Sequence, residues 1–188
     1  MTVVSAVDGR ARCPWAGTDA AYLAYHDDEW GRPLRGEQPL FERISLEAFQ
    51  SGLSWLTILR KRQAFRAAFA GFDIDAVAGF DAADVDRLLA DAGIVRNRAK
   101  IVATIANARA VRACIEDLDA LLWSFAPDEH VRPVTPADTA AFTPQSTAMA
   151  GELKRRGLRF VGPTTAYALM QATGMVDDHL VGCWRASG

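Results

Sequence analysis

Two pairs of metal-binding residue types lie at opposite ends of this 188-residue chain. Cys13 and His26 are close to its start, and His179 and Cys183 are close to its end. Two cysteines and two histidines complete the tetrahedral shell of a structural zinc ion and leave no position open for water. The four-residue spacing of His179 and Cys183 would place both on one face of a helix. The same residues also fit buried, apolar cysteines and hydrogen-bonded core histidines, and spacing alone leaves both interpretations open.

A dense block of aromatic and acidic residues overlaps the first of these pairs and continues to Trp55. It contains three of the five tryptophans and two of the three tyrosines of the chain. Flat rings grouped near a carboxylate suit a planar, positively charged ligand. The alternative is that the rings fill the protein core, as aromatic side chains usually do. The candidate pocket residues in this block are Trp15, Tyr22, Tyr25, Trp30, Glu47 and Trp55.

A basic segment near the end of the chain has the composition of a helical hairpin. Lys154 opens a run of basic residues that stops at Gly157, and a second glycine, Gly162, directly precedes Pro163. Glycine before a helix and proline in its first turn are both favoured. The exposed N–H groups of such a helix start can bind an anion, and the basic residues would attract a phosphate backbone. An ordinary turn between two helices with a solvated basic face explains the same pattern.

The elements that must position these residues are predicted to be helices. Apolar residues recur at helical intervals through most of the chain, whereas the alternation typical of strands is almost absent. Asp81 or Asp84 can cap a helix that stops at Gly93, and Asn97 can open a long alanine-rich helix. We therefore predict an all-α fold, with a long loop over residues 126–144. The other predicted helices cover residues 40–51, 53–70, 145–156 and 164–172.

The composition of the whole chain limits the function classes. We expect one domain over residues 1–188, with a possible small second lobe, because half of the residues are hydrophobic. The net charge of −2 means that any surface for a polyanion must be local. Three scattered cysteines do not suggest a disulfide framework, and we find no signal peptide and no membrane-length apolar run. These features predict a cytoplasmic protein with no membrane partner, which we expect to be a monomer.

Several separate motifs, in this order along the chain, resemble those of a known enzyme family. Residues 155–166 resemble the hairpin of the helix–hairpin–helix superfamily of DNA glycosylases, with Phe160 where many relatives have glycine. Residues 92–101 also resemble a turn of that superfamily. The full set is similar to the bacterial 3-methyladenine DNA glycosylase I family from Arg12 to Cys183. It comprises RCPW (12–15), AYHDDEWG (24–31), GLSW (52–55), FVGPTT (160–165) and DHLVGC (178–183).

The resemblance implies a fold, a metal and a reaction. The family has the helix–hairpin–helix glycosylase fold and removes N3-methyladenine from double-stranded, alkylated DNA by hydrolysing its N-glycosidic bond. It implies one structural Zn²⁺ per chain, held by Cys13, His26, His179 and Cys183, that joins the two ends of the chain. Glu47 would accept hydrogen bonds from the adenine edge and serve as the catalytic carboxylate. The pocket walls would be Trp15, Tyr22, Tyr25, Trp30 and Trp55, and the DNA contacts Arg159, Gly162, Thr164 and Thr165.

Two departures from the wider superfamily shape the expected mechanism. Many superfamily members carry a catalytic aspartate after the hairpin, and here Asp177 and Asp178 are the nearby candidates, either as helpers or as residues that orient His179. Bifunctional relatives place a lysine nucleophile just after the hairpin glycine, where this chain has Pro163-Thr164-Thr165. Without that amine no Schiff base can form, which predicts a monofunctional enzyme that leaves the abasic site intact.

Other functions remain open from the sequence. One is a zinc-stapled module that binds damaged DNA without catalysis, although such a binder has no need for a buried carboxylate among rings. Another is a glycosylase for a different alkylated purine, which pocket volume would separate. A metal hydrolase is disfavoured because four protein ligands leave no open coordination position.

Overall fold

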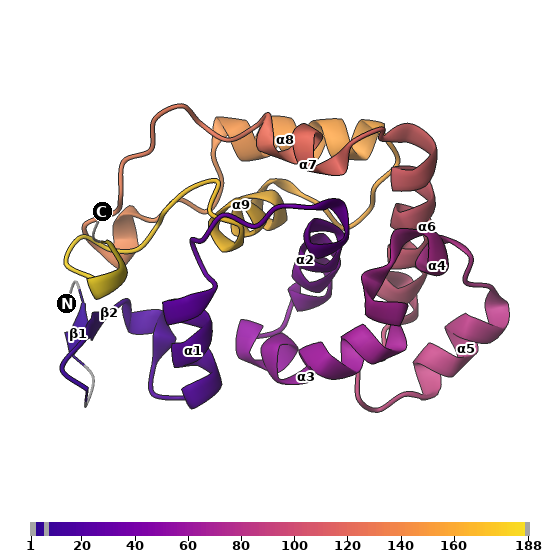
Figure 1. The fold of residues 1–188 in the computed structure, drawn as a ribbon, viewed down its shortest axis with the longest axis horizontal. Helices are drawn as coiled ribbons and strands as arrows, with labels where there is room; N and C mark the ends of the chain where they lie inside the picture. The colour runs from indigo at the N-terminus through magenta and orange to yellow at the C-terminus, as the bar shows by residue number, and fades with distance from the viewer. Residues whose placement is uncertain (1–2, 6–7, 187–188) are drawn as a thin grey trace.

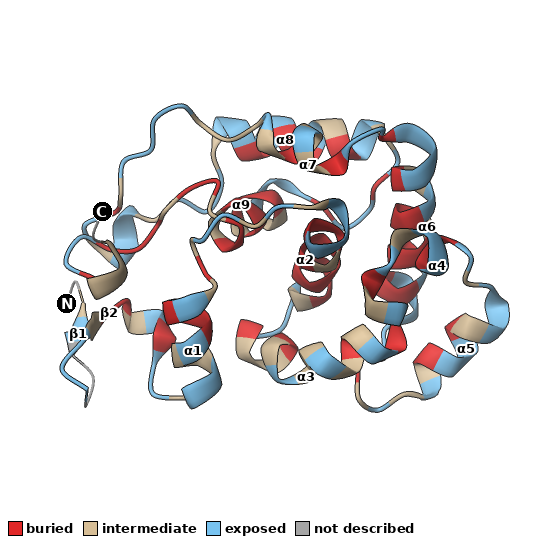
Figure 2. Cartoon of the chain, in the orientation of Figure 1, coloured by how far each residue is buried: buried red, intermediate tan, exposed pale blue. Residues whose placement is uncertain are grey.

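A buried helix, α2 (Glu37–Gln50), lies at the centre of the fold (Figure 1). The computed structural model describes residues 3–5 and 8–186. Figure 2 shows that α2 is buried along most of its length, including two charged residues, Arg43 and Glu47. It packs against α3 (Trp55–Ala68), α6 (Arg98–Cys114), α7 (Leu118–Trp123) and α9 (Pro163–Ala172). The charged pair on this central helix therefore needs partners inside the protein.

Side-chain caps explain where several of the predicted helices begin. Ser54 accepts a hydrogen bond from the backbone N–H of Thr57 at the start of α3, and Asn97 accepts one from Lys100 at the start of α6. At α5 (Ala82–Ala90) it is Asp81 that caps the first turn, in a reciprocal capping box with Asp84. These contacts satisfy N–H groups that have no partner within the helix. The predictions of capped helices after Asp81 and after Asn97 are confirmed.

The first α-helix and two short helices lie outside the residue ranges predicted above. Helix α1 (Ala20–Asp28) is capped by Asp19 and carries Tyr22 and Tyr25. The short helices α4 (Ile74–Ala78) and α7 were missed, because five or six residues are too few to show a helical period. Short 3₁₀ turns complete the helical structure, at Pro14–Ala16, Ala70–Phe72, Pro136–Asp138 and Trp184–Ala186.

A small antiparallel pair of strands departs from the all-α expectation. Strand β1 (Val4–Ser5) pairs with β2 (Ala11–Arg12). Two residues per strand cannot produce the alternating pattern by which strands are recognised in a sequence. The rest of the described chain is helices and connecting segments, so the protein is mostly helical as predicted.

The predicted hairpin is a tight turn between α8 (Pro144–Arg155) and α9, which pack against each other. Gly157 ends α8 with a φ of +96°, a conformation that glycine adopts without strain. Phe160 also has a positive φ, of 58°, and is one of the few non-glycine residues that does. Both helices begin at a proline, because proline fits the first turn: α8 starts one residue earlier than predicted, and α9 starts at the proline predicted for its first turn.

The two ends of the described chain lie side by side, at the left of Figure 1. Leu180 donates its backbone N–H to the Sγ of Cys13, 3.4 Å away. Cys13, Leu180 and Cys183 form a small buried cluster separate from the main core. The predicted long loop between α7 and α8 also reaches this region, because the N–H of Val181 donates to the carbonyl of Pro133 at 2.9 Å. In the part of the chain that the structure describes, every helix is too short or too polar to cross a membrane.

Candidate active site and neighbouring metal centre

A cavity of about 350 Å³ opens between the N-terminal helices, α9 and the C-terminal segment. That volume is within the range of small-molecule pockets, which begins at roughly 300 Å³. All six residues proposed from the sequence as base-binding line it: Trp15, Tyr22, Tyr25, Trp30, Glu47 and Trp55. The other lining residues, of which only Asp178 was a candidate from the sequence, as a catalytic helper, are Pro14, Gln50, Pro136, Thr139, Ala168, Gln171, Asp178 and Leu180.

The rings of this cavity contact one another in tilted and edge-on arrangements. The ring centroid of Trp15 lies 4.8 Å from that of Trp30 and 5.3 Å from that of Tyr22. The rings of Tyr25 and Trp55 lie 5.3 Å apart. Mutual packing of this kind holds each ring in place and leaves the cavity open between them. The indole Nε1–H of Trp55 is buried and has no acceptor among the described residues, so a donor is available at the cavity wall.

Glu47 is the carboxylate at the base of this pocket. Its side chain is buried, and burial raises its pKa from the ordinary value of 4.5 to about 7, against the opposing effect of Arg43. A carboxylate removed from water in this way is poised between its neutral and ionised forms near neutral pH. A positively charged ligand entering the cavity would favour the ionised form and bind to it strongly.

A second carboxylate, Asp178, lies in the cavity wall and was not assigned there from the sequence. Its Oδ1 lies 2.7 Å from Nε2 of His130, and its Oδ2 accepts hydrogen bonds from Tyr167 (2.8 Å) and Gln171 (2.7 Å). Asp177 takes the other role, because its Oδ1 lies 2.8 Å from Nδ1 of His179. Of the two candidates proposed as helpers or orienting residues, Asp177 contacts the histidine and Asp178 lines the pocket.

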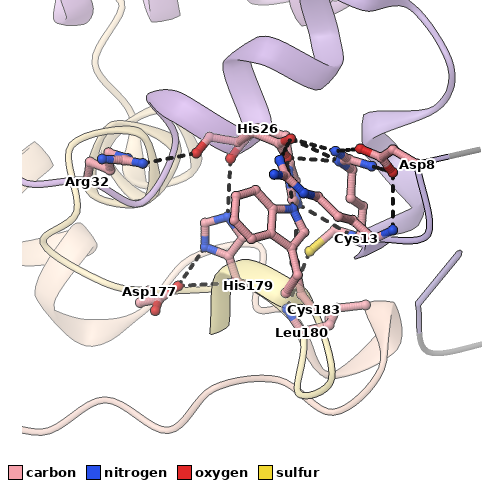
Figure 3. Close-up of polar contacts among 12 residues, drawn as sticks. Asp8, Cys13, His26, Arg32, Asp177, His179, Leu180 and Cys183 are labelled. Carbon is pink, nitrogen blue, oxygen red and sulfur yellow. Dashed lines mark hydrogen bonds and ion pairs between the residues drawn. The ribbon is translucent and has the colours of Figure 1, made fainter. Parts of the chain in front are cut away.

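Three of the four predicted metal ligands converge where the two ends of the described chain meet (Figure 3). The ligand atoms of Cys13, His26 and Cys183 all lie within 4.8 Å of one another, and all three residues are buried. His179 lies next to this group, with its ring 4.8 Å from the ring of His26 and its Nε2 3.4 Å from the carbonyl oxygen of His26. The expectation that His179 and Cys183 share a helical face is wrong. They lie in a non-helical segment with a turn at Gly182, whose φ is +92°.

The surroundings of these side chains fit a thiolate- and imidazole-binding metal such as zinc. Nδ1 of His26 lies 2.8 Å from Oδ1 of Asp27, as Nδ1 of His179 does from Asp177. A carboxylate at Nδ1 leaves Nε2 as the nitrogen with the free lone pair, which is the usual arrangement around a ligating histidine. The hydrogen bond from Cys13 and the nearby His26 lower the pKa of the Cys183 thiol to about 4, while that same pairing and burial raise the pKa of Cys13. Without a cation the pair therefore holds one thiolate and one thiol, and a bound dication would allow both cysteines to ionise.

The cluster of candidate metal ligands and the pocket share a wall. The ring of His26 lies 5.2 Å from that of Trp15, and the ring of His179 lies 4.7 Å from that of Trp30. Gly31 allows this close approach, since a Cβ atom there would sit 2.9 Å from Cε1 of His179. Pocket residues and metal-binding residues therefore depend on the same packing.

The four proposed DNA-contact residues lie together in the hairpin and the first turn of α9. Arg159, Gly162 and Thr164 are exposed and Thr165 is half-buried. The hairpin is fastened to α6 because Asn107 accepts a hydrogen bond from the N–H of Arg159 at 2.8 Å and donates one to its carbonyl at 3.0 Å. The basic character is weaker than the sequence suggests, since Arg155 and Arg156 are both ion-paired with Glu152.

Comparison with known proteins agrees with this geometry. The family model for methyladenine glycosylases matches residues 15–186. The chain is 47% identical to DNA-3-methyladenine glycosylase 1 of Escherichia coli K12, over 92% of this chain and 95% of that protein. A crystal structure of a 3-methyladenine DNA glycosylase I superposes with a TM-score of 0.89 at 44% identity, covering 92% of this chain and 98% of the other.

A second solved structure is that of 3-methyladenine DNA glycosylase I from Staphylococcus aureus. It concerns the structural basis of 3-methyladenine recognition by that enzyme. It superposes with a TM-score of 0.88 at 32% identity and covers 94% of this chain and 97% of the other. The family match spans nearly the whole chain, including the ring-walled cavity and the segment that carries Cys183. The chain belongs to the methyladenine glycosylase family.

Proposed function

We propose that this chain is a monofunctional DNA glycosylase that hydrolyses the N-glycosidic bond of N3-methyladenine in alkylated double-stranded DNA. The E. coli and S. aureus relatives carry the name of this activity. The observation that carries the proposal is Glu47, a buried carboxylate in a cavity walled by aromatic rings. Such a site suits a flat, positively charged base and offers little to an uncharged one.

The reaction needs the damaged base outside the duplex. Flipping a base from the stack costs on the order of a few kcal/mol, which contacts in the cavity must offset. Methylation at N3 gives the base a positive charge, so the electrons of the broken N9–C1′ bond neutralise it as it leaves. Water forms the new bond to C1′ and loses its proton. Because the cationic base leaves readily, the enzyme needs little help for its departure, and most of the selectivity comes from binding and charge complementarity.

Glu47 supplies that complementarity. Its ionised form would accept charge-assisted hydrogen bonds from the edge of the bound purine, which are stronger than neutral ones. The rings of Tyr25 and Trp55 and those of Trp15, Tyr22 and Trp30 would hold the base by stacking. A normal adenine lacks the positive charge and forfeits the electrostatic part of this binding.

The metal centre would be a structural zinc site. When bound, zinc would cross-link Cys13, His26, His179 and Cys183 and so hold the two ends of the chain together. His179 lies outside the group formed by the other three and would have to move towards it. Asp177 keeps its Nε2 available. The metal has no part in the chemical step, because four protein ligands leave no site for water or substrate.

The DNA would be held at the helix–hairpin–helix formed by α8, the turn and α9. The first turn of α9 has no side-chain cap, so its N–H groups are available to a phosphate, with Gly162 leaving room for close approach. Arg159 would add attraction for the backbone, and Thr164 and Thr165 hydroxyl donors. No lysine lines the cavity among the described residues, which supports cleavage of the glycosidic bond alone.

The proposal extends to domain organisation, oligomeric state and cellular compartment. We propose a single-domain monomer that works in the cytoplasm. One continuous hydrophobic cluster links α1, α2, α6 and α9, as expected for a single domain. The cysteines Cys13, Cys114 and Cys183 are unpaired, which fits a reducing compartment.

The decisive experiment is incubation of the purified protein with methylated double-stranded DNA, followed by chromatography of the released bases. Release of N3-methyladenine with intact abasic sites supports the proposal. Release of a different alkylated purine would assign another substrate. Binding without any release would leave a damaged-DNA binder. Elemental analysis of the same sample tests for one zinc per chain.

A further inference from the structure

A buried arginine, Arg43, lies behind the pocket and has no place in the function proposed so far. Its residue exposure is 7%, and it occupies the same face of α2 as Glu47, one helical turn earlier. A buried guanidinium is costly unless it is paired and hydrogen-bonded. Its contacts therefore indicate what the fold uses it for.

Arg43 contacts two of the pocket rings and one carboxylate. Its Nη1 donates to the hydroxyl of Tyr25 at 3.1 Å, and its guanidinium carbon lies 5.4 Å from the ring centroids of both Tyr25 and Trp55. Its Nη2 lies 3.5 Å from Oε2 of Glu29. The other oxygen of that carboxylate, Oε1, accepts a hydrogen bond from Arg62 at 2.8 Å. Arg43 thus joins the walls of the cavity through one charged group.

The hydrogen bond to Tyr25 fixes the direction of that hydroxyl. Because Arg43 only donates, the Tyr25 oxygen is the acceptor and keeps its own O–H free to donate. A tyrosine hydroxyl, with an ordinary pKa of about 10, is protonated at neutral pH. Tyr25 is one of the residues that line the cavity, and this O–H is the only polar group of its side chain.

The charge of Arg43 acts on Glu47 in the opposite sense to burial. Burial raises the pKa of Glu47, and the field of Arg43 lowers it. The other titratable groups around the cavity are Tyr22 and Tyr25 on α1, which stay neutral, and Asp178, whose oxygens face three donors. Glu29 pairs with both Arg43 and Arg62, so it partly neutralises the charge of Arg43.

We propose that Arg43 is a positioning residue for the pocket, which favours the ionised form of Glu47 and directs the Tyr25 hydroxyl towards the bound purine. This inference rests on the proposed function. It also implies a compromise, because a buried positive charge repels the same cationic base that Glu47 attracts. Glu29 limits that repulsion by pairing with Arg43.

The test is a titration of Glu47 itself, which needs neither DNA nor a substrate. The full-length protein is labelled with ¹³C at glutamate carboxyls, and the Glu47 signal is assigned from its loss in Glu47→Gln. In Arg43→Met we expect the titration midpoint to rise by about one pH unit, as for loss of a nearby opposite charge. In Arg43→Lys, which keeps the charge, the midpoint should stay near that of the parent. Glu29→Gln should lower it, because the field of Arg43 is then less neutralised.

A binding measurement supplies the second arm. The probes are a permanently cationic N3,N9-dimethylated adenine and, as a control, neutral 9-methyladenine. At neutral pH, Arg43→Met should bind the cation about fivefold more weakly, following the smaller ionised fraction of Glu47. At a pH two units higher, where Glu47 is ionised in both proteins, the variant should bind it equally well or more tightly.

An unchanged Glu47 midpoint in Arg43→Met, with the cation bound more weakly by the same factor at both pH values, would overturn the proposal and leave Arg43 as packing only. If Arg43→Met does not fold, the opposite shift expected for Glu29→Gln decides, and no shift there counts against the proposal. A protein whose Glu47 midpoint shifts as expected but that binds neither purine would instead refute the proposed function.

Discussion

Asp177 and Asp178 are consecutive residues whose carboxylates serve two different sites. Asp177 hydrogen-bonds the ring and the backbone N–H of His179, whereas Asp178 faces the cavity and contacts His130, Tyr167 and Gln171. The metal centre and the pocket are therefore joined at one peptide bond. A displacement of either carboxylate would be transmitted to the other.

This division of roles gives a matched pair of substitutions. Asp177→Asn replaces the charged acceptor of the His179 Nδ1–H by a neutral amide, which weakens the hold on the tautomer with Nε2 available, and we expect metal affinity to fall roughly 10- to 100-fold. Asp178→Asn should leave the metal content unchanged and alter purine binding. Competition with a chromogenic zinc chelator measures the first effect, and titration with 3-methyladenine the second. Equal metal loss in both variants would contradict the assignment, and Cys114→Ser, at an exposed cysteine, is the control for the thiol count.

The role of Glu47 predicts a loss of catalysis without a loss of DNA affinity. Glu47→Gln keeps the size and shape of the side chain but removes the charge that the cationic base needs. Hydrogen bonds to charged groups contribute about 1.5–3 kcal/mol, so we expect single-turnover excision to fall roughly tenfold to a hundredfold. Fluorescence anisotropy with undamaged duplex DNA should give the same Kd for both proteins. A variant with parental excision rates would refute the role.

The raised pKa of Glu47 also predicts how stability depends on pH. Between pH 4.5 and about 7 the folded protein holds a proton on Glu47 that the unfolded chain has released. The folded state then binds more protons, so this group makes the free energy of unfolding fall as pH rises through that window. The difference amounts to on the order of 3 kcal/mol, and above pH 7 it is fully lost. Denaturant unfolding of the parent and Glu47→Gln across this window measures it: their stability difference should change in favour of the variant as pH rises, whereas parallel curves would contradict the burial of an ionisable carboxyl.

The hairpin predicts a sequence-independent contribution to DNA binding. Arg159→Ala should weaken binding to any duplex and reduce the slope of log K against log salt by about one, as expected when one phosphate contact is lost. Arg155→Ala is the matched control, because Arg155 is already paired with Glu152 on the exposed face of α8. Filter binding at several salt concentrations distinguishes the two. An Arg159→Ala protein with the parental salt slope would place the DNA elsewhere.

Much of the fold was predictable from local signals. The helices that begin at Asn97 and Asp81 have both a side-chain cap and a helical apolar pattern, and both were found. The helices Ile74–Ala78 and Leu118–Trp123 are too short for any period to emerge. The expected helix through His179 and Cys183 does not exist, because contacts with Cys13 and Pro133 hold that segment in another conformation. Local spacing could not show a constraint imposed from the other end of the chain.

The candidate site likewise contains residues that the sequence could indicate and residues that it could not. Trp15, Tyr25 and Glu47 stand out because rings near a carboxylate are a compositional signal. Gln171 and Thr139 carry no such signal, since ordinary polar residues become part of a cavity only when distant segments pack together. Arg43 had no signal either, because its burial follows from the position of α2 at the centre of the fold.

The closure of residue 13 onto residue 183 has a consequence for how the protein is made. During synthesis, the wall formed by Asp178 and Leu180 is missing until those residues have left the ribosome. A product that terminates before Asp177 therefore has neither a complete cavity nor the Cys183 that completes the cluster with Cys13 and His26.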